Sequence, residues 1–303
     1  MKKSVLIILL WFYANIFSQD PKVSSGTLKF YPNFKFTFVD ARNVAVWLPK
    51  NYSEKEKYAV LYLHDGAMLF DANTTWNKKS WEIDETVQRL LNEKKISNCI
   101  IVGIWNNGDY RHSEYFPEKI VKNIPEATRK IVVEEQLEGK PQGDNYLKFI
   151  VSELKPFVDK TFASKTDRAN TFVGGASMGG LISLYALCEY PEVFGGAICM
   201  STHSPMTRSE KLAMVAESDL ASKFRDYLSE NLPNPETHRI YMDYGDQTLD
   251  VYYKFFQDKI DEVIIKIGYS ATTWNTKFFA GDDHSETSWA RRLDVPLVFM
   301  LNK

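Results

Sequence analysis

The sequence predicts an α/β protein built on one doubly wound, mostly parallel β-sheet with antiparallel N-terminal strands. Continuous apolar runs of the kind found in strands buried on both faces recur along the chain. Segments with a helical apolar stripe separate these runs, and such alternation is typical of a parallel sheet. The chain has 303 residues, of which 44% are hydrophobic and 25% charged. This composition suits one soluble domain with a sizeable core.

The N-terminus differs from the rest of the chain. Met1-Lys2-Lys3 is positively charged, residues 5–17 are apolar apart from Asn15, and the chain turns polar at Ser18. The apolar stretch is too short for a spanning helix but typical of a secretory signal. We therefore expect residues 1–18 to be a signal peptide and residues 19–303 to form one domain. The expected location is periplasmic or secreted, without stable membrane association after cleavage; the alternative is an uncleaved anchor.

The first strands of the domain are predicted to be antiparallel. Residues 34–39 alternate between aromatic or apolar and polar side chains, and the apolar run 43–48 follows after a short turn. Two strands so close in sequence favour a hairpin. Residues 23–29 are polar and are predicted to be loose.

Helices and strands alternate in the rest of the chain. Residues 108–141 break this rhythm and are predicted to be a long irregular insertion, of the kind that shapes a pocket or lid. The predicted strands are residues 59–64, 98–104, 171–173, 195–200, 239–244 and 273–279. The predicted helices are residues 81–91, 145–158, 178–189, 210–228, 249–263 and the segment from 286 onward.

The motif Gly175-Ala176-Ser177-Met178-Gly179 lies between a predicted strand and a predicted helix. In this context a G-x-S-x-G sequence indicates a nucleophile elbow, a strained turn that presents the serine hydroxyl above the sheet. The following helix N-terminus favours developing negative charge. The alternative is a glycine-rich turn with an incidental serine. We interpret Ser177 as a nucleophile.

A serine nucleophile needs a base and an acid that orients the base. His284 lies in the loop after the last predicted strand, where the chain order Ser, Asp, His places the base. The acid is expected after strand 239–244, where Asp246 and Asp250 both qualify by position. We favour Asp250, although a carboxylate that merely stabilises a helix N-terminus is the alternative. Asp243 is expected to lie within the strand.

Two backbone amides are expected to stabilise a tetrahedral oxyanion. One belongs to Met178, directly after the nucleophile, and the other to Gly66 or Ala67 in the loop after the first buried strand. An ordinary Asp-Gly turn is the alternative for that loop.

Two further side chains are candidates for substrate contact. His203 follows the strand after Ser177 and is expected at the pocket rim. Trp105 is the leading candidate for an aromatic rim that binds sugar or aryl groups, with Trp274 and Trp289 as further candidates. Simple packing is the alternative for each of the three.

Charge and ligand spacing argue against several classes of partner. The net charge of −2 provides no basis for binding nucleic acid. The run Asp282-Asp283-His284 lacks further ligands at metal spacing, and the spacing of Asp243, Asp246 and Asp250 does not match a calcium loop. We therefore expect neither metal nor cofactor.

The motifs together resemble the esterase D-like family of α/β-hydrolases, which includes feruloyl and acetyl-xylan esterases, S-formylglutathione hydrolases, siderophore esterases and mycolyltransferases. The residues that carry the resemblance are Arg42-Asn43-Val44, Leu63-His64-Asp65-Gly66, the 174–180 turn and Ala280-Gly281-Asp282-Asp283-His284. It implies Ser177 as nucleophile, His284 as base and Met178 as oxyanion donor. Many members place the acid where this chain has Thr248. Ala67-Met68 is also less polar than the corresponding pair in many members.

The predicted function is that of a serine carboxylesterase acting through an acyl-enzyme. By resemblance, the expected substrates are acetyl, feruloyl or short-chain acyl groups esterified to carbohydrate, as small molecules or oligosaccharides. A thioesterase or acyltransferase of the same fold is one alternative. A non-catalytic module that binds a ligand is the other.

Overall fold

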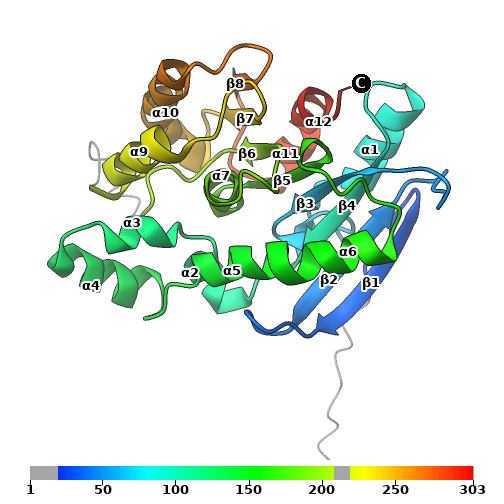
Figure 1. Cartoon of the computed structure of the whole chain (residues 1–303), viewed down its shortest axis with the longest axis horizontal. Coiled ribbons are helices and arrows are strands. Elements are labelled where there is room, and N and C mark those ends of the chain that lie inside the picture. Colours follow the sequence, from blue (N-terminus) through cyan, green and yellow to red (C-terminus); the bar gives the residue numbers. More distant parts are fainter. Residues whose placement is uncertain (1–19, 208–218, 303) are drawn as a thin grey trace, which may run out of the picture.

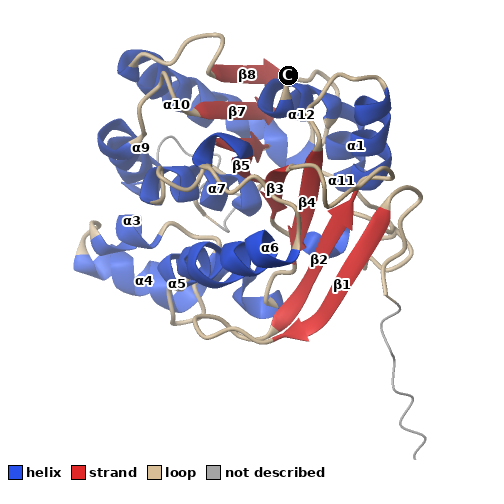
Figure 2. Cartoon of the chain, turned by 45° about the vertical axis from the view of Figure 1, so that its right-hand side comes forward, coloured by secondary structure: helices blue, strands red, loops and turns tan. Residues whose placement is uncertain are grey.

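An eight-stranded mixed β-sheet organises residues 20–207 and 219–302, the part of the chain that the computed structural model describes (Figure 2). The strand order is β1-β2-β4-β3-β5-β6-β7-β8, in which β1, β2 and β4 pair antiparallel and the remaining pairs are parallel. This arrangement confirms the predicted fold class. The strands are β1 Thr27–Phe34, β2 Arg42–Leu48, β3 Ala59–Leu63, β4 Cys99–Ile104, β5 Thr171–Ala176, β6 Gly196–Met200, β7 Arg239–Tyr244 and β8 Trp274–Phe278.

Helices cover both faces of the sheet, because successive side chains of a buried strand point to opposite faces. In β2, Val44 and Val46 join one apolar cluster, and Ala45 and Trp47 join the other. The first cluster contains residues of α5 Gly143–Phe149, α6 Lys155–Thr161, α7 Met178–Glu189, α9 Asp219–Asn231 and α10 Tyr253–Ile267. The second contains residues of α1 Ile83–Asn92, α11 Glu286–Arg292 and α12 Asp294–Leu301.

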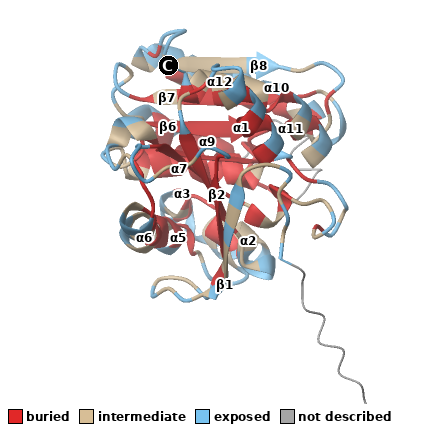
Figure 3. Ribbon diagram, turned by 90° about the vertical axis from the view of Figure 1, so that its right-hand side faces the viewer, coloured by how far each residue is buried: buried red, intermediate tan, exposed pale blue. Residues whose placement is uncertain are grey.

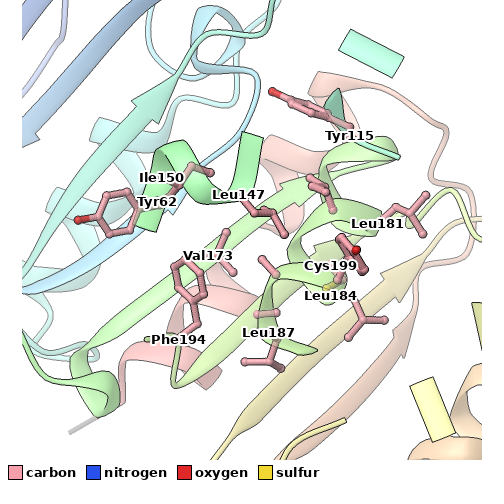
Figure 4. Close-up of a cluster of buried hydrophobic side chains, with 14 of the residues drawn as sticks. Tyr62, Tyr115, Leu147, Ile150, Val173, Leu181, Leu184, Leu187, Phe194 and Cys199 are labelled. Atoms are coloured by element: carbon pink, nitrogen blue, oxygen red, sulfur yellow. The ribbon is translucent and has the colours of Figure 1, made fainter. Parts of the chain in front are cut away.

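The central strands and α7 form the most deeply buried part of the molecule (Figure 3). Every residue of β5 is buried, and so are the first eleven residues of α7. Figure 4 shows Leu181, Leu184 and Leu187 of α7 packed in the first cluster beside Val173 of β5. The chain around Ser177 is therefore held from both sides by a rigid core.

The prediction of a strand over residues 34–39 was wrong. The first strand is β1, which begins at Thr27 within the segment predicted to be loose, and pairs with β2. The alternating aromatic residues pack instead on the helical segment 143–161, which Figure 1 shows as one green rod. The ring of Phe36 contacts that of Phe149, and the amide of Thr37 donates to the carboxylate of Glu153 at 2.9 Å. Period-two alternation therefore reflects aromatic packing on a helix at this position.

The insertion 108–141 is largely helical rather than irregular. It contains α2 Arg111–Glu114, α3 Glu118–Lys122 and α4 Glu126–Gln136. Ile120, Val121 and Val132 are buried in the first cluster, which accounts for the order of this segment. A buried ion pair also ties it to the sheet, because Glu114 binds Arg42 at 2.7 Å.

Two expectations fall outside the described residues. The proposed signal peptide at 1–18 is one of them, and the first part of the predicted helix 210–228 is the other; α9 begins at Asp219. Among residues 20–207 and 219–302, no helix combines the length and apolar character needed to cross a membrane.

Candidate active site

Ser177 occupies a strained turn between β5 and α7. Its backbone angles are φ 58° and ψ −121°, a region that residues other than glycine rarely adopt. A Cβ atom on Gly175 would lie 2.8 Å from the carbonyl carbon of Gly179, so a side chain there would push strand and helix apart. The Ser177 amide donates to Met200 in β6 at 2.9 Å. The turn thus has the geometry that the motif predicts.

His284 lies beside Asp250, as the chain order predicts. The Nδ1 atom of His284 is 2.6 Å from Oδ1 of Asp250. The rings of Tyr253 and Trp289 meet the imidazole edge-on, with centroids 5.6 and 5.0 Å away. The His284 amide donates to the Thr248 hydroxyl at 2.9 Å. Thr248 therefore anchors the histidine loop, and the carboxylate is supplied two residues later.

The Asp250 carboxylate is buried and accepts hydrogen bonds at both oxygens. Oδ2 accepts from the Gly245 amide at 2.7 Å and from the Ser201 hydroxyl at 2.6 Å. Burial by itself raises the pKa of Asp250, but hydrogen bonds from His284, Ser201 and Gly245 together bring the pKa below its ordinary value. The carboxylate is therefore charged at neutral pH and able to hold the imidazole.

The competing aspartates have other partners. Asp246 accepts from the Gly281 amide at 2.8 Å and from the Gln247 side chain at 2.9 Å. Asp243 lies in β7, as predicted, and pairs with Arg292 at 2.8 Å. Asp250 is thus the aspartate that the structure brings to His284.

Ser201 is a site residue that the sequence analysis did not single out. Its hydroxyl oxygen accepts from Nε1 of Trp289 at 3.0 Å and from Nη2 of Arg292 at 2.7 Å. Since these two donors occupy both lone pairs of the oxygen, the hydroxyl proton is directed at Asp250. Nothing in the local sequence signals this role, because Trp289 and Arg292 come from α11, far along the chain.

We predict that Ser201→Ala lowers kcat about tenfold and leaves KM nearly constant. The variant removes one hydrogen bond to a charged group, and this bond positions Asp250 rather than substrate. Steady-state kinetics on a soluble ester checks the result. Ser204→Ala is the matched control, because within the described residues the buried Ser204 hydroxyl has no hydrogen-bond partner. Equal loss in both variants would contradict a positioning role for Ser201.

The predicted oxyanion donors lie at the N-terminus of α7 and in the short helix η1 Gly66–Met68. Among the described residues, the amides of Met178 and Ala67 donate no hydrogen bond, so both are available to a ligand. Gly66 packs under Trp105, whose ring atom lies 2.4 Å from the place a Cβ would occupy. Ala67 lines the cavity described below, and Gly66 does not.

Arg111 and Asn106 hold the loop after β3 in place by binding Asp65. Arg111 donates from Nε and Nη2 to the two carboxylate oxygens of Asp65, each at 2.7 Å, and the Asn106 side-chain Nδ2 donates to Oδ1 at 2.7 Å. Burial raises the pKa of Asp65, but Arg111, Asn106 and His64 together bring it below its ordinary value. The insertion 108–141 thus contributes Arg111 to the site, in keeping with its predicted role in shaping a pocket.

Ser177 and His284 both line one cavity of about 700 Å³. Its other lining residues include Asp65, Met68, Trp76, Asn77, Lys79, Trp81, Asn106, Arg111, Ser285, Glu286 and Trp289. Within the described residues, the Ser177 hydroxyl makes no hydrogen bond with His284, and the neighbouring Tyr253 hydroxyl is bound to His203 Nδ1 at 2.8 Å. Nucleophile–base bonds are often long without substrate and tighten in the reacting complex.

The expected substrate contacts of His203 and Trp105 gain no support from the structure, since neither side chain lines the cavity. His203 is buried, with Nδ1 bound to the Tyr253 hydroxyl at 2.8 Å and Nε2 to the Thr207 carbonyl at 2.9 Å. Burial lowers its pKa to about 4, so the ring is neutral and supports Tyr253. The Trp105 ring packs against Gly66 and Phe30. Position after a strand does not reveal whether a side chain turns inward.

Of the other candidate rim residues, Trp289 lines the cavity and Trp274 does not.

The acidic residues of the histidine loop are bound to other protein groups. Asp282 pairs with Arg291 and Arg292, and Asp283 accepts from Ser285 and Ser288. In the described parts of the chain, no group of three or more His, Cys, Asp or Glu side chains is arranged to hold a metal ion.

Comparison with known proteins identifies the family. A family model described as "Putative esterase" matches residues 37–300. The YjcH protein of Bacillus subtilis (strain 168) is 27% identical over 196 residues, which cover 64% of this chain and 68% of that protein. An endo-1,4-beta-xylanase/feruloyl esterase of Xylanibacter ruminicola is 26% identical over 174 residues, which cover 53% of this chain and 20% of that protein.

Among solved structures, a ferulic acid esterase has the same fold. It superposes with a TM-score of 0.63 at 20% sequence identity, over 91% of this chain and 97% of that chain. The family match covers most of the chain, including the serine turn and the histidine loop. The chain therefore belongs to this esterase family of α/β-hydrolases, the carboxylesterases of the serine hydrolase class.

Proposed function

We propose that this protein hydrolyses carboxylic esters in which an acetyl, feruloyl or short-chain acyl group is attached to a carbohydrate. The observation that carries the proposal is that Ser177, His284 and Ala67 line one cavity, with Asp250 bound to His284 and the Met178 amide directly after Ser177 at the N-terminus of α7. Nucleophile, base, orienting acid and oxyanion donors are the parts that acyl transfer to serine requires.

The proposed reaction has two halves. Ser177 Oγ attacks the ester carbonyl while His284 Nε2 takes its proton, and the oxyanion binds the Met178 and Ala67 amides. The C–O bond to the alcohol then breaks, and His284 returns the proton to the leaving oxygen. In the second half, water attacks the acyl-enzyme with His284 again as base. The acid is released and Ser177 regains its proton.

Two features support a substrate larger than a simple acyl ester. The cavity of about 700 Å³ has room beyond the reacting carbonyl, and both aromatic and polar side chains line it. Two of the proteins similar to this chain carry feruloyl or ferulic acid esterase in their names. A carbohydrate-borne ester combines a ring that stacks on aromatic side chains with hydroxyl groups that bind polar ones.

A serine-directed fluorophosphonate probe tests the proposal. The protein is expected to be labelled at Ser177, with mass spectrometry of the modified peptide as the readout. Acetyl, feruloyl and butyryl esters of a sugar then identify the acyl group by the acid released. Absence of labelling and of turnover would leave the non-catalytic alternative. Thioester substrates and added alcohol acceptors test the thioesterase and acyltransferase alternatives, because an acyltransferase forms a new ester instead of free acid.

We also propose that residues 1–18 direct export to the periplasm or the medium. The support is the charged N-terminus followed by a short apolar stretch and a polar junction. Intact-mass measurement of the protein expressed with its own N-terminus tests this. A mature protein that begins near Gln19 in the exported fraction agrees with the proposal, and a full-length membrane-bound protein contradicts it.

A further inference from the structure

Trp76 stands almost fully in solvent at the mouth of the active-site cavity. It lines the cavity, yet 86% of its surface is exposed, the largest fraction among the exposed large hydrophobic residues in the described parts of the chain. Exposing an indole ring to water is unfavourable unless the ring is covered by something else. The loop that carries Trp76 therefore presents an unused apolar face beside the site.

Local hydrogen bonds hold this loop in one conformation. The Thr74 hydroxyl donates to the Asp71 carbonyl at 2.9 Å, and the Thr75 hydroxyl donates to the Ala72 carbonyl at 2.9 Å. The Thr75 hydroxyl also accepts from the Lys79 amide at 3.0 Å. Trp76 is thus presented on a preorganised turn, which reduces the entropy lost when a ligand covers it.

The loop is joined to the His284 side of the cavity. The Asn77 side-chain Nδ2 donates to the Glu286 carboxylate at 2.9 Å, and Glu286 begins α11, two residues after His284. Asp65, Asn106 and Arg111 also line the cavity, but hydrogen bonds link them to one another rather than to this loop. Trp76 therefore belongs to the wall that carries the general base.

Reaction geometry decides which part of an ester lies on that wall. His284 Nε2 has to protonate the departing alkoxide oxygen, so the alcohol part of the substrate lies next to His284. The acyl part extends from the carbonyl carbon away from this oxygen. A ring at the outer end of the His284 wall thus meets the alcohol, whatever the acyl group is.

We propose that Trp76 is the stacking platform of a subsite for the sugar ring on the alcohol side of the substrate. The inference rests on the proposed esterase function and adds that this wall binds the alcohol part of the substrate. Asn77, Lys79 and Glu286 lie around Trp76 on the cavity wall and provide hydrogen-bond donors and acceptors for ring hydroxyl groups. An apolar face with polar groups at its edge matches a pyranose, which has C–H groups on its faces and hydroxyl groups at its rim.

The test compares esters that share an acyl group and differ in the alcohol. The proteins compared are wild type, Trp76→Ala, Trp76→Phe and the control Phe278→Ala. A pH-stat follows hydrolysis of methyl acetate, phenyl acetate and acetylated xylobiose. Absorbance follows hydrolysis of methyl ferulate and of a feruloylated arabinoxylan oligosaccharide. Phe278 is 53% exposed on β8 and does not line the cavity.

For the sugar esters, Trp76→Ala is expected to raise KM at least about fivefold relative to the methyl ester of the same acid, as for loss of an aromatic anchor. Trp76→Phe is expected to restore part of this difference, and Phe278→Ala to leave the ratio of the two KM values as in wild type. Equal effects of Trp76→Ala on sugar and methyl esters would overturn the proposal. An increase in KM for phenyl acetate as large as that for acetylated xylobiose would also overturn the proposal, since Trp76 would then bind aryl alcohols equally well.

A binding measurement separates this proposal from the esterase function. Xylotetraose is titrated into the Ser177→Ala variant, with and without Trp76→Ala, and indole fluorescence and calorimetry report binding. Saturable binding that is lost with Trp76 supports the subsite even if no ester is hydrolysed. Unaltered binding without Trp76, or no binding in either variant, contradicts the subsite and leaves the esterase proposal intact.

Discussion

Ser177→Ala is expected to lower kcat for every ester at least about 10⁴-fold. Alanine removes the atom that forms the acyl-enzyme, and the remaining parts of the site supply only binding and oxyanion stabilisation. Release of acid from a sugar acetate, followed in a pH-stat, measures the loss.

The control for this prediction is the double variant. His284→Ala is expected to lose about as much activity as Ser177→Ala, and Ser177→Ala with His284→Ala is expected to be no worse than either, because the two groups act as one unit. Circular dichroism and thermal unfolding verify that each variant is folded. Multiplicative losses, or a folded Ser177→Ala variant with near wild-type turnover, would refute the assigned roles.

Asp250→Asn is expected to lower kcat about 10⁴-fold while the fold is retained. The oxygen of the new amide replaces Oδ2, where the Ser201 hydroxyl and the Gly245 amide both donate. The amide nitrogen then faces His284 Nδ1, which becomes an acceptor and moves the imidazole proton to Nε2. Nε2 can no longer accept the Ser177 proton. The measurement is kcat for a soluble ester near neutral pH.

Asp246→Asn is the matched comparison. Asp246 accepts from the Gly281 amide and the Gln247 side chain, and an asparagine oxygen can accept both bonds. We therefore expect kcat within about threefold of wild type, as for a substitution that removes no buried partner. The reverse order of effects would transfer the acid role to Asp246.

Local sequence was sufficient for the features that depend on neighbouring residues. The turn at Ser177 was predictable because Gly175 and Gly179 permit the close approach that its backbone angles need. Strands β3 to β7 were predicted from largely apolar runs, and all their residues except Arg239 are buried. The prediction of a strand over residues 34–39 failed because the pattern has two physical explanations. Alternating aromatic residues are typical of a strand, but these pack on the helical segment 143–161.

Side-chain direction was the other limit. Trp105 follows a strand that ends at the site, yet its ring packs against Gly66. His203 also follows such a strand, and its nitrogens are held by Tyr253 and the Thr207 carbonyl. Trp76, in contrast, lies in a loop without motif or periodicity, and its position at the cavity mouth emerges only when α11 is packed beside it.

The sequence by itself determined the fold class, the serine turn and the loop that carries His284, because each depends on apolar periodicity or on glycines within a few residues. Tertiary structure decided which aspartate meets the imidazole, that Ser201 holds this aspartate, and which tryptophans reach the cavity. These contacts join the ends of β6, β7 and β8 with α11, and their geometry depends on how the whole sheet twists and packs. Proximity between such distant segments arises only when the core forms.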